Sequence, residues 1–259
     1  MQSGLDQIGN IGIINFHKSY LFPRKWLLAR KILKQNKNLK TIVEKRGIIE
    51  GTLRTFKTKH LTGEKTTTTL HKENNCIFYL NIDKTYFSSR LSNERKVISE
   101  EVLKLVKKIK NPKILVMFAG VAPYPITIAK LLKKNKIKAE IYSNELNKEA
   151  NKFAEKNAQL NKLQNEIIFI NGDAKKIKTK EKFDIILMTR PNIKDTFLKT
   201  ALKLGKKGTT IFYHGFGTKD SVLKEIKKDG KKKIGKIKIR KAGDIAPFKF
   251  RWQAVFKEI

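Results

Sequence analysis

Residues 113–134 read KILVMFAGVAPYPITIAKLLKK, an apolar run followed by a short loop and an amphipathic stretch. The run Lys113–Phe118 has the length and composition of a buried strand, and Ala119-Gly120 ends it. The stretch from Pro123 to Lys134 has helical spacing, and its prolines suit the first turn of a helix. The segment therefore predicts a strand, a loop and a helix in direct succession.

The same order repeats towards the C-terminus. Further strands are predicted at Ala139–Ser143, Ile167–Ile170, Phe183–Met188 and Thr209–His214, and helices at Asn147–Asn161, Phe197–Leu204 and Asp220–Lys228. Short buried strands that alternate with helices predict a parallel sheet covered on both faces. Ile234–Arg240 and Lys249–Lys257 then alternate with period two and have no helix between them. The prediction is an α/β fold in which a Rossmann-like sheet ends in an antiparallel hairpin, an arrangement typical of class I methyltransferases.

The first part of the chain has a different pattern. Strands are predicted at Ile11–Phe16, Thr41–Lys45, Thr66–His71, Cys76–Ile82 and Thr85–Phe87, and helices at Trp26–Lys34 and Glu94–Ile109. The last three strands alternate like a small antiparallel sheet. We therefore expect a small α+β domain at residues 1–87 and a Rossmann-like methyltransferase domain at residues 88–259.

Positive charge dominates the composition. The 259 residues include 58 Lys and Arg against 23 Asp and Glu, which gives a formal net charge of +35. Such an excess destabilises a compact state by self-repulsion unless salt or a polyanion screens it. A nucleic acid is the obvious polyanion, because counterion release would then supply most of the affinity. A genome-wide bias towards lysine is the alternative, but such a bias should enrich glutamate as well. We expect the small domain to bind RNA.

Several classes of protein are excluded by composition. Cys76 is the one cysteine, so neither a disulfide within the chain nor a cysteine-based metal site is possible. The four histidines show no ligand spacing, and no metal is expected. No apolar run approaches the roughly 20 residues of a membrane span, and the N-terminus lacks the order of a signal peptide. We expect a cytoplasmic protein.

The loop after the first strand of the sheet, residues 118–125 (FAGVAPYP), contains one glycine, Gly120. A dinucleotide needs the three glycines of G-x-G-x-x-G so that the backbone can approach a pyrophosphate. S-adenosyl-L-methionine has no phosphate, and one close approach at Gly120 suffices for it. The loop alone is a weak signal, because many strand-to-helix turns carry a glycine.

Acidic residues follow the next two strands. The second strand ends in Ser143-Asn144-Glu145 and the third in Gly172-Asp173-Ala174. Glu145 can accept both ribose hydroxyl protons, and Asp173 can face the adenine amino group. Each has an ordinary alternative, since Glu145 can favour a helix N-terminus and Asp173 can cap a turn. Three such features at consecutive strand ends indicate a methyltransferase that uses S-adenosyl-L-methionine.

Four segments carry a family resemblance: 70–74 (LHKEN), 86–91 (YFSSRL), 93–95 (NER) and 118–125. They resemble the archaeal and eukaryotic class I tRNA guanine-37-N1-methyltransferases. The likeness is greatest to the archaeal branch that also methylates the 4-demethylwyosine intermediate at the same nucleotide, and it extends from about Leu5 to the C-terminus. It implies an enzyme that acts on position 37 in the anticodon loop of a tRNA, and we expect this enzyme to be a monomer.

The resemblance also implies residue roles. Glu94 matches the general base of the family and Arg54 an active-site arginine. The positions implied to contact the cofactor are Arg95, Phe118, Ala119, Gly120, Val121, Pro123, Tyr124, Glu145, Leu146, Asp173, Ala174, Thr189 and Pro191. The chemistry agrees, because a carboxylate near guanine N1 can take its proton and an arginine near O6 can stabilise the developing negative charge.

Each of these roles has a plain alternative. Glu94 can be a first-turn helix acid, and Arg54 can be a surface contact to a phosphate. Tyr86 and Phe87 fit a core better than a base-stacking role. The sequence also departs from the family at Met188-Thr189-Arg190-Pro191, where ordinary members have an Asn-x-Pro motif. The bifunctional branch departs at the same place, so this difference favours that branch and leaves the role of Thr189 open.

Family members usually begin with an additional small domain associated with the outer corner of the tRNA, and we expect this chain to start after it. Binding would then depend more on the basic surface and on salt. Two alternative functions remain. A related enzyme transfers the aminocarboxypropyl group of the same cofactor to the wyosine precursor. A basic tRNA-binding protein with a degenerate enzyme fold would have no activity, but the presence of Glu94, Glu145 and Asp173 argues against it.

Overall fold

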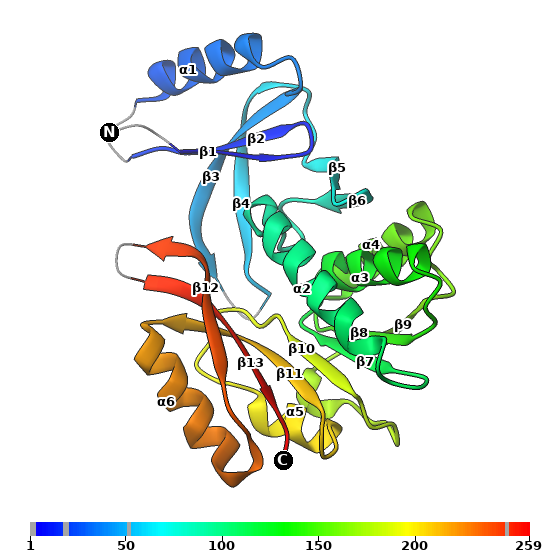
Figure 1. The fold of residues 1–259 in the computed structure, drawn as a ribbon. Coiled ribbons are helices and arrows are strands. Elements are labelled where there is room, and N and C mark those ends of the chain that lie inside the picture. Colours follow the sequence, from blue (N-terminus) through cyan, green and yellow to red (C-terminus); the bar gives the residue numbers. More distant parts are fainter. Residues whose placement is uncertain (1–3, 18–20, 51–52, 247–248) are drawn as a thin grey trace. The chain divides into compact units, whose positions relative to one another are not determined.

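The computed structural model describes residues 4–17, 21–50, 53–246 and 249–259. The chain divides into two compact units, Met1–Ser92 and Asn93–Ile259 (Figure 1). The sequence-based boundary between residues 87 and 88 stays a prediction about folding domains. Among the described residues, every helix is too short or too polar to pass through a lipid bilayer.

The second unit is built on a seven-stranded sheet with the order β12-β13-β11-β10-β7-β8-β9. Its strands are β7 (Lys113–Met117), β8 (Glu140–Glu145), β9 (Ile167–Asn171), β10 (Ile185–Met188), β11 (Thr210–Gly217), β12 (Lys238–Ala246) and β13 (Lys249–Lys257). The strands from β7 to β11 run parallel, whereas β13 lies antiparallel between β11 and β12. The predicted α/β sheet with a closing hairpin is confirmed.

The helices of this unit cover both faces of the sheet. They are α2 (Ser92–Val106), α3 (Pro123–Lys134), α4 (Lys148–Leu160), α5 (Leu198–Leu204) and α6 (Lys219–Gly230). Leu115, Met117 and Ile186 share a buried cluster with residues of α5 and α6. Because the strand order reverses between β7 and β10, right-handed crossovers place α3 and α4 on the other face. In open α/β sheets, ligands bind in the crevice at such a reversal, which here lies at the carboxyl ends of β7 and β10.

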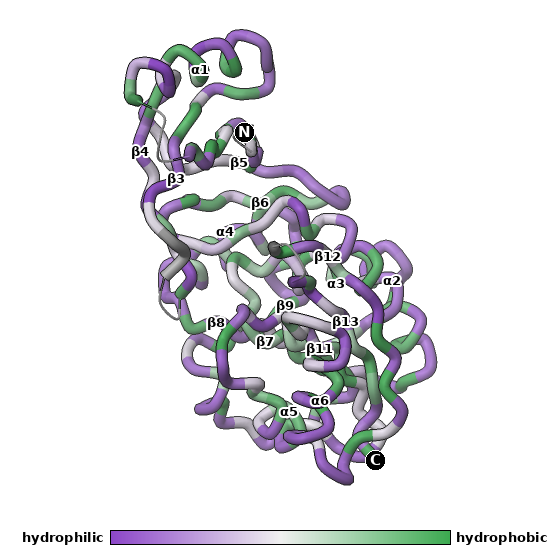
Figure 2. Tube along the Cα trace, turned by 90° about the vertical axis from the view of Figure 1, so that its left-hand side faces the viewer, coloured by the Kyte–Doolittle hydropathy of each residue, from purple (hydrophilic) through white to green (hydrophobic). Residues whose placement is uncertain are grey.

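The first unit contains a four-stranded sheet in the order β1-β2-β3-β4. Its strands are β1 (Gly4–Ile8), β2 (Ile11–Asn15), β3 (Thr41–Glu50) and β4 (Thr55–Gly63), and α1 (Phe22–Gln35) packs against them. Hydrophobic and hydrophilic residues alternate along α1 (Figure 2). Its buried side brings Ala29 against Ile14, Ile42 and Leu61 of the sheet, which explains why this basic helix stays folded on the unit.

A separate hairpin of β5 (Thr68–Glu73) and β6 (Cys76–Asn81) completes the first unit. The strand predicted at Thr85–Phe87 is wrong. The Asn81 carboxamide accepts hydrogen bonds from the backbone N–H groups of Asp83 and Lys84, which turns the chain away from the sheet. Phe87 is buried because it packs against Phe78 of the hairpin. The interpretation of Phe87 as a core residue agrees with this packing.

Candidate functional site

The loop after β7 has an unusual backbone. Phe118, Gly120 and Ala122 all have positive φ values, of 62°, 60° and 62°. Glycine adopts this left-handed backbone conformation freely, whereas the conformation costs roughly 1–2 kcal/mol at each of the other two residues. Strain of this kind persists where surrounding contacts impose it and is common at ligand sites. The backbone N–H of Gly120 donates a hydrogen bond of 2.7 Å to Oε2 of Glu145, so the loops after β7 and β8 are joined.

Glu145 uses both carboxylate oxygens to organise this edge of the sheet. Oε1 accepts a 2.8 Å hydrogen bond from the backbone N–H of Asn147. Burial raises the pKa of Glu145, and the N–H groups of Asn147 and Gly120 oppose that rise. The N–H of Leu146 also favours the ionised carboxylate, and one of its roughly four lone-pair sites remains for a further hydrogen bond. Leu146, the next residue, is apolar and 44% exposed.

Asn144 fastens the loop after β9 to the end of β8. Its buried Nδ2 donates hydrogen bonds of 2.9 and 3.0 Å to the carbonyl oxygens of Ile170 and Gly172. The backbone N–H of Gly172 in turn donates to the carbonyl oxygen of Glu145, at 2.8 Å. The carboxyl ends of β8 and β9 are therefore held in register up to Asp173.

Asp173 begins a short 3₁₀ helix, η2 (Ala174–Lys176), and Ala174 is buried. Its Oδ1 accepts a 2.9 Å hydrogen bond from the backbone N–H of Lys175. Asp173 is thus a cap, the ordinary alternative that its sequence context suggested. Its Oδ2 accepts no hydrogen bond from the part of the chain that the structure describes, which leaves this oxygen available to a ligand.

Thr189 joins the end of β10 to the end of β7. Its hydroxyl donates to the carbonyl oxygens of Met117 and Phe118, at 3.0 and 3.2 Å. The ring of Phe118 also meets the ring of Phe197 edge to face, with centroids 4.9 Å apart. Pro191, between Thr189 and Phe197, is partly exposed. Thr189 therefore fastens the loop after β7 to the end of β10, and its contact with the cofactor stays a prediction.

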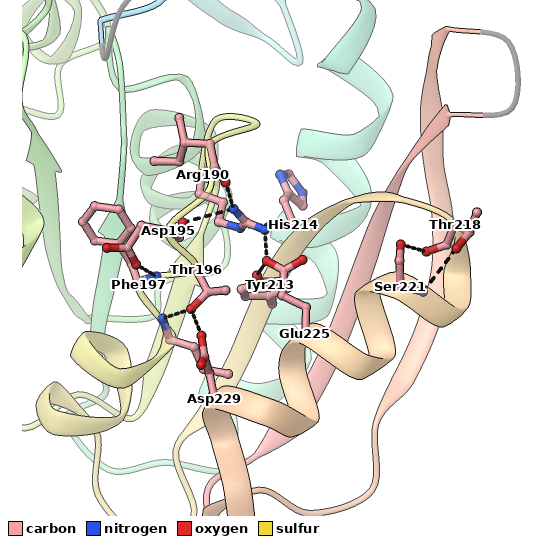
Figure 3. A network of polar contacts seen from close by, with 12 residues as sticks. Arg190, Asp195, Thr196, Phe197, Tyr213, His214, Thr218, Ser221, Glu225 and Asp229 are labelled. Carbon is pink, nitrogen blue, oxygen red and sulfur yellow. Dashed lines mark hydrogen bonds and ion pairs between the residues drawn. The ribbon is translucent and has the colours of Figure 1, made fainter.

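Arg190 organises the segment that follows β10 (Figure 3). Its side chain is buried, and it donates hydrogen bonds of 3.0, 3.0 and 3.2 Å to the carbonyl oxygens of His214, Ile193 and Asp195. Nη2 also forms an ion pair with Glu225 of α6. The segment after β10 has no regular secondary structure, so its carbonyl oxygens accept hydrogen bonds from the Arg190 guanidinium instead of from a helix or strand partner.

Glu94 lies in the first turn of α2, and its side chain is almost completely buried. Both carboxylate oxygens accept hydrogen bonds from the Arg240 guanidinium of β12, with Nη1–Oε2 at 2.7 Å and Nη2–Oε1 at 3.0 Å. Nε2 of His214 on β11 lies 3.7 Å from Oε1, beyond hydrogen-bond distance. Burial alone would raise the pKa of Glu94, but His214 and Arg240 outweigh it and lower the pKa below its usual value.

Strand register explains how these side chains meet. His214 of β11 is opposite Gln253 of β13, which is opposite Arg240 of β12. Residues paired in this way present their side chains on the same face of a sheet. Three buried polar atoms near Glu94 have no hydrogen-bond partner among the described residues: Oη of Tyr124, Nε2 of His214 and Oε1 of Gln253. Burial lowers the pKa of His214, so its ring favours the neutral form.

The other residues implied by the resemblance fall into two groups. Arg95, Ala119, Val121, Pro123 and Tyr124 are buried, and the Arg95 guanidinium lies 5.9 Å from the centroid of the Tyr124 ring. Arg54 belongs to the first unit, directly before β4, and has a φ of 53°. Its guanidinium carbon lies 5.7 Å from the centroid of the Tyr86 ring.

Sequence reasoning missed five polar residues of this region: Asn144, Arg190, His214, Arg240 and Gln253. Asn144 and Arg190 stand inside motifs that were singled out, and a polar residue at the end of a buried strand was the available signal. Arg240 and Glu94 are 146 residues apart in the chain. No local pattern connects residues so distant, and their pairing becomes visible once the hairpin is placed beside β11.

Comparison with known proteins gives matches along almost the whole chain. Residues 69–240 match the family described as the TRM5/TYW2 methyltransferase domain, and residues 1–66 match the TYW2 N-terminal domain. The tRNA (guanine(37)-N(1))-methyltransferase Trm5b of Pyrococcus abyssi is 35% identical over 218 residues, 84% of this chain and 61% of that protein. The tRNA (guanine(37)-N(1))/4-demethylwyosine(37)-methyltransferase Taw22 of Nanoarchaeum equitans is 48% identical over 136 residues, 52% of this chain and 42% of that protein.

Solved structures agree with these matches. A complex of aTrm5 with tRNALeu superimposes with a TM-score of 0.85 at 26% identity, and the match covers 99% of this chain and 72% of that chain. The chain spans less than two thirds of the length of either curated relative.

Proposed function

Since this chain belongs to the TRM5/TYW2 methyltransferase family, we propose that it transfers a methyl group from S-adenosyl-L-methionine to N1 of guanine 37 in tRNA. The observation that carries the proposal is the joined set of loops at the carboxyl edge of the sheet. Glu145 and Thr189 fasten the Gly120 loop from both sides, and the ionised Glu94 is buried in the same unit.

The crevice residues fit S-adenosyl-L-methionine. When bound, this cofactor supplies an electrophilic methyl group on a sulfonium. Glu145 would accept a hydrogen bond from a ribose hydroxyl through its remaining lone-pair site, and Leu146 would cover one face of the adenine. Asp173 would accept a hydrogen bond from the adenine amino group through Oδ2. The backbone of Phe118-Ala119-Gly120 would approach the cofactor closely, because Gly120 has no side chain and the loop already holds its strained conformation.

We assign the proton chemistry to Glu94. Guanine N1 carries a proton, and a carboxylate must be ionised to take it. Glu94 meets this condition, because its pKa lies below the usual value despite burial. Removal of the proton places negative charge on O6, and we propose that Arg54 stabilises this charge. The nucleotide would have to leave the anticodon-loop stack to reach Glu94.

The bifunctional relative favours a second activity. The 48% identity to Taw22 supports methylation of the 4-demethylwyosine intermediate at the same position as well as methylation of guanine. The net charge of +35 suits a tRNA partner. We propose that the enzyme works as a monomer in the cytoplasm, and that the basic first unit contributes to tRNA binding.

The test is incubation of the protein with tRNA and a cofactor labelled in the methyl group, followed by mass spectrometry of the nucleosides. Label in N1-methylguanosine at position 37 is expected. RNA that stays free of label but contains a nucleoside with the added mass of an aminocarboxypropyl group would assign the related transfer reaction instead. Glu94→Gln should abolish methylation while cofactor affinity stays within severalfold, and unchanged turnover would remove Glu94 from the mechanism.

A further inference from the structure

We propose that Arg240 is a positioning residue for Glu94, which fixes the orientation of the carboxylate and keeps it ionised in a buried site. The inference rests on the proposed function, in which Glu94 takes the proton from the substrate base. The inference gives the closing hairpin a functional role. Its strands β12 and β13 lie outside the parallel strands whose carboxyl ends form the crevice.

The contact between the two residues is a parallel pair of hydrogen bonds. Nη1 and Nη2 of Arg240 each donate to a different oxygen of Glu94, at 2.7 and 3.0 Å. This fork geometry restrains rotation of the carboxylate, which a single hydrogen bond would not do. Arginine occupies two of the roughly four lone-pair sites of the carboxylate, so acceptor sites remain for the proton of a substrate.

Burial makes the partner necessary. The side chain of Glu94 is 6% exposed, and a buried carboxyl without a partner resists ionisation. Arg240 is 38% exposed at its side chain, so its own charge stays close to water while it neutralises the buried one. The pair therefore combines a desolvated acceptor with a solvated cation, and its desolvation penalty is smaller than that of a pair with both charges buried.

Other groups around Glu94 cannot replace this cation. His214 on β11 favours its neutral form and lies 3.7 Å away. Tyr124 on α3 is neutral because burial raises its pKa, and Glu101 on α2 is a like charge. Arg251 on β13 affects His214 and Tyr124 electrostatically, and it forms no hydrogen bond with Glu94. His214 also lowers the pKa of Glu94, but Arg240 is the cation that donates hydrogen bonds to both of its carboxylate oxygens.

The test compares pH–rate profiles of single-turnover methylation for wild type, Arg240→Met, Arg240→Lys and Arg251→Met. An opposite charge at this distance lowers a carboxyl pKa by roughly 1–3 units. In Arg240→Met, the acid limb of the pH–rate profile should therefore move to a higher pH by about that much. At a pH on the shifted limb, its turnover should be at least about tenfold below wild type, and alkaline pH should restore much of it. Arg240→Lys retains the charge without the fork and should fall between the two.

Arg251→Met is the matched control. It removes the same charge from the neighbouring strand and should weaken RNA binding without moving the acid limb. If Arg240 were only a contact to an RNA phosphate, Arg240→Met would raise KM, reduce the salt dependence of binding and leave the acid limb in place, as in Arg251→Met. That outcome would overturn the proposal, and so would a loss of turnover that is equal at every pH.

A measurement without substrate separates this inference from the proposed function. Carbon-13 NMR of the glutamate carboxyl groups gives the pKa of Glu94 directly, with Glu94→Gln used for assignment. We expect a higher pKa for Glu94 in Arg240→Met than in wild type, and equal values would refute the inference whatever the activity. If the pKa rises but Glu94→Gln remains active, the pair exists and the proposed base is wrong.

Discussion

Replacing Arg190 by methionine should destabilise the second unit strongly. The substitution keeps much of the apolar volume and removes the donors that hold the carbonyl oxygens of His214, Ile193 and Asp195. It also leaves Glu225 without its ion-pair partner. Removal of one member of a buried pair costs about 3–5 kcal/mol. Because the Glu225 side chain is 26% exposed, water screens part of this cost, and we expect the lower end, about 3 kcal/mol.

The expected shift in melting temperature follows from the size of the protein. A change of about 1 kcal/mol moves the Tm of a protein of this size by about 2–4 °C, so Arg190→Met should melt roughly 6–12 °C below wild type. Calorimetry measures this shift. Lys152→Met is the control, because it breaks an exposed i,i+3 pair with Glu149 in the same unit. Such pairs contribute about 0.3–0.5 kcal/mol, so its Tm should change by no more than about 2 °C.

A second substitution tests the cause. If the unpaired carboxylate of Glu225 is the main cost, Glu225→Gln should restore part of the stability when it is added to Arg190→Met. Hydrogen exchange should also become faster at residues 191–197, since Arg190 fixes this segment. The assigned role of Arg190 would be refuted if Arg190→Met had the same Tm as the Lys152→Met control and if residues 191–197 exchanged hydrogen at wild-type rates.

Three further predictions concern the site. Glu145→Ala should raise the dissociation constant of S-adenosyl-L-methionine by roughly 10–100-fold, because hydrogen bonds to a charged group contribute about 1.5–3 kcal/mol; calorimetry that finds no change would reject the ribose contact. Thr189→Val removes the hydroxyl bound to Met117 and Phe118, so thermal denaturation should show a loss of about 1 kcal/mol, and a wild-type Tm would contradict this. The pKa of Glu94 is lower in the folded than in the unfolded state. The ionised carboxylate therefore stabilises the fold at pH values above its ordinary pKa, and this contribution disappears as the pH falls through the folded-state pKa. Wild type should therefore lose more stability than Glu94→Gln between about pH 5 and pH 3 in urea titrations, and parallel losses would argue against the ion pair.

The parallel sheet was predictable because its strands are short apolar runs. β7 and β10 are buried along almost their full length, and such runs stand out in a basic sequence. β1 and β4 were not predicted, because each strand buries one residue and the alternation of apolar and polar residues is incomplete. The hairpin strand predicted at Ile234–Arg240 begins instead at Lys238. Ile234 pairs with Glu258 in an isolated bridge, so the period-two pattern extended beyond the strand itself.

The site was partly predictable for the same physical reason. Gly120, Glu145 and Asp173 follow strand ends, and the ends of parallel strands meet at one edge. The contacts that hold these residues depend on side chains whose partners are set by topology. Asn144 reaches across to β9 and Thr189 reaches back to β7. A polar residue at a strand end has many available partners, and the sequence contains nothing that selects among them.

The position of β13 has a consequence for how an active molecule is assembled. β13 lies between β11 and β12 although it follows both in the chain. Arg240, on the outer strand β12, can reach Glu94 only after β13 has been inserted. During synthesis from the N-terminus, Glu94 of α2 is therefore made about 150 residues before its partner Arg240. A nascent chain that ends before β13 could form the parallel strands, but its Glu94 would lack the Arg240 partner.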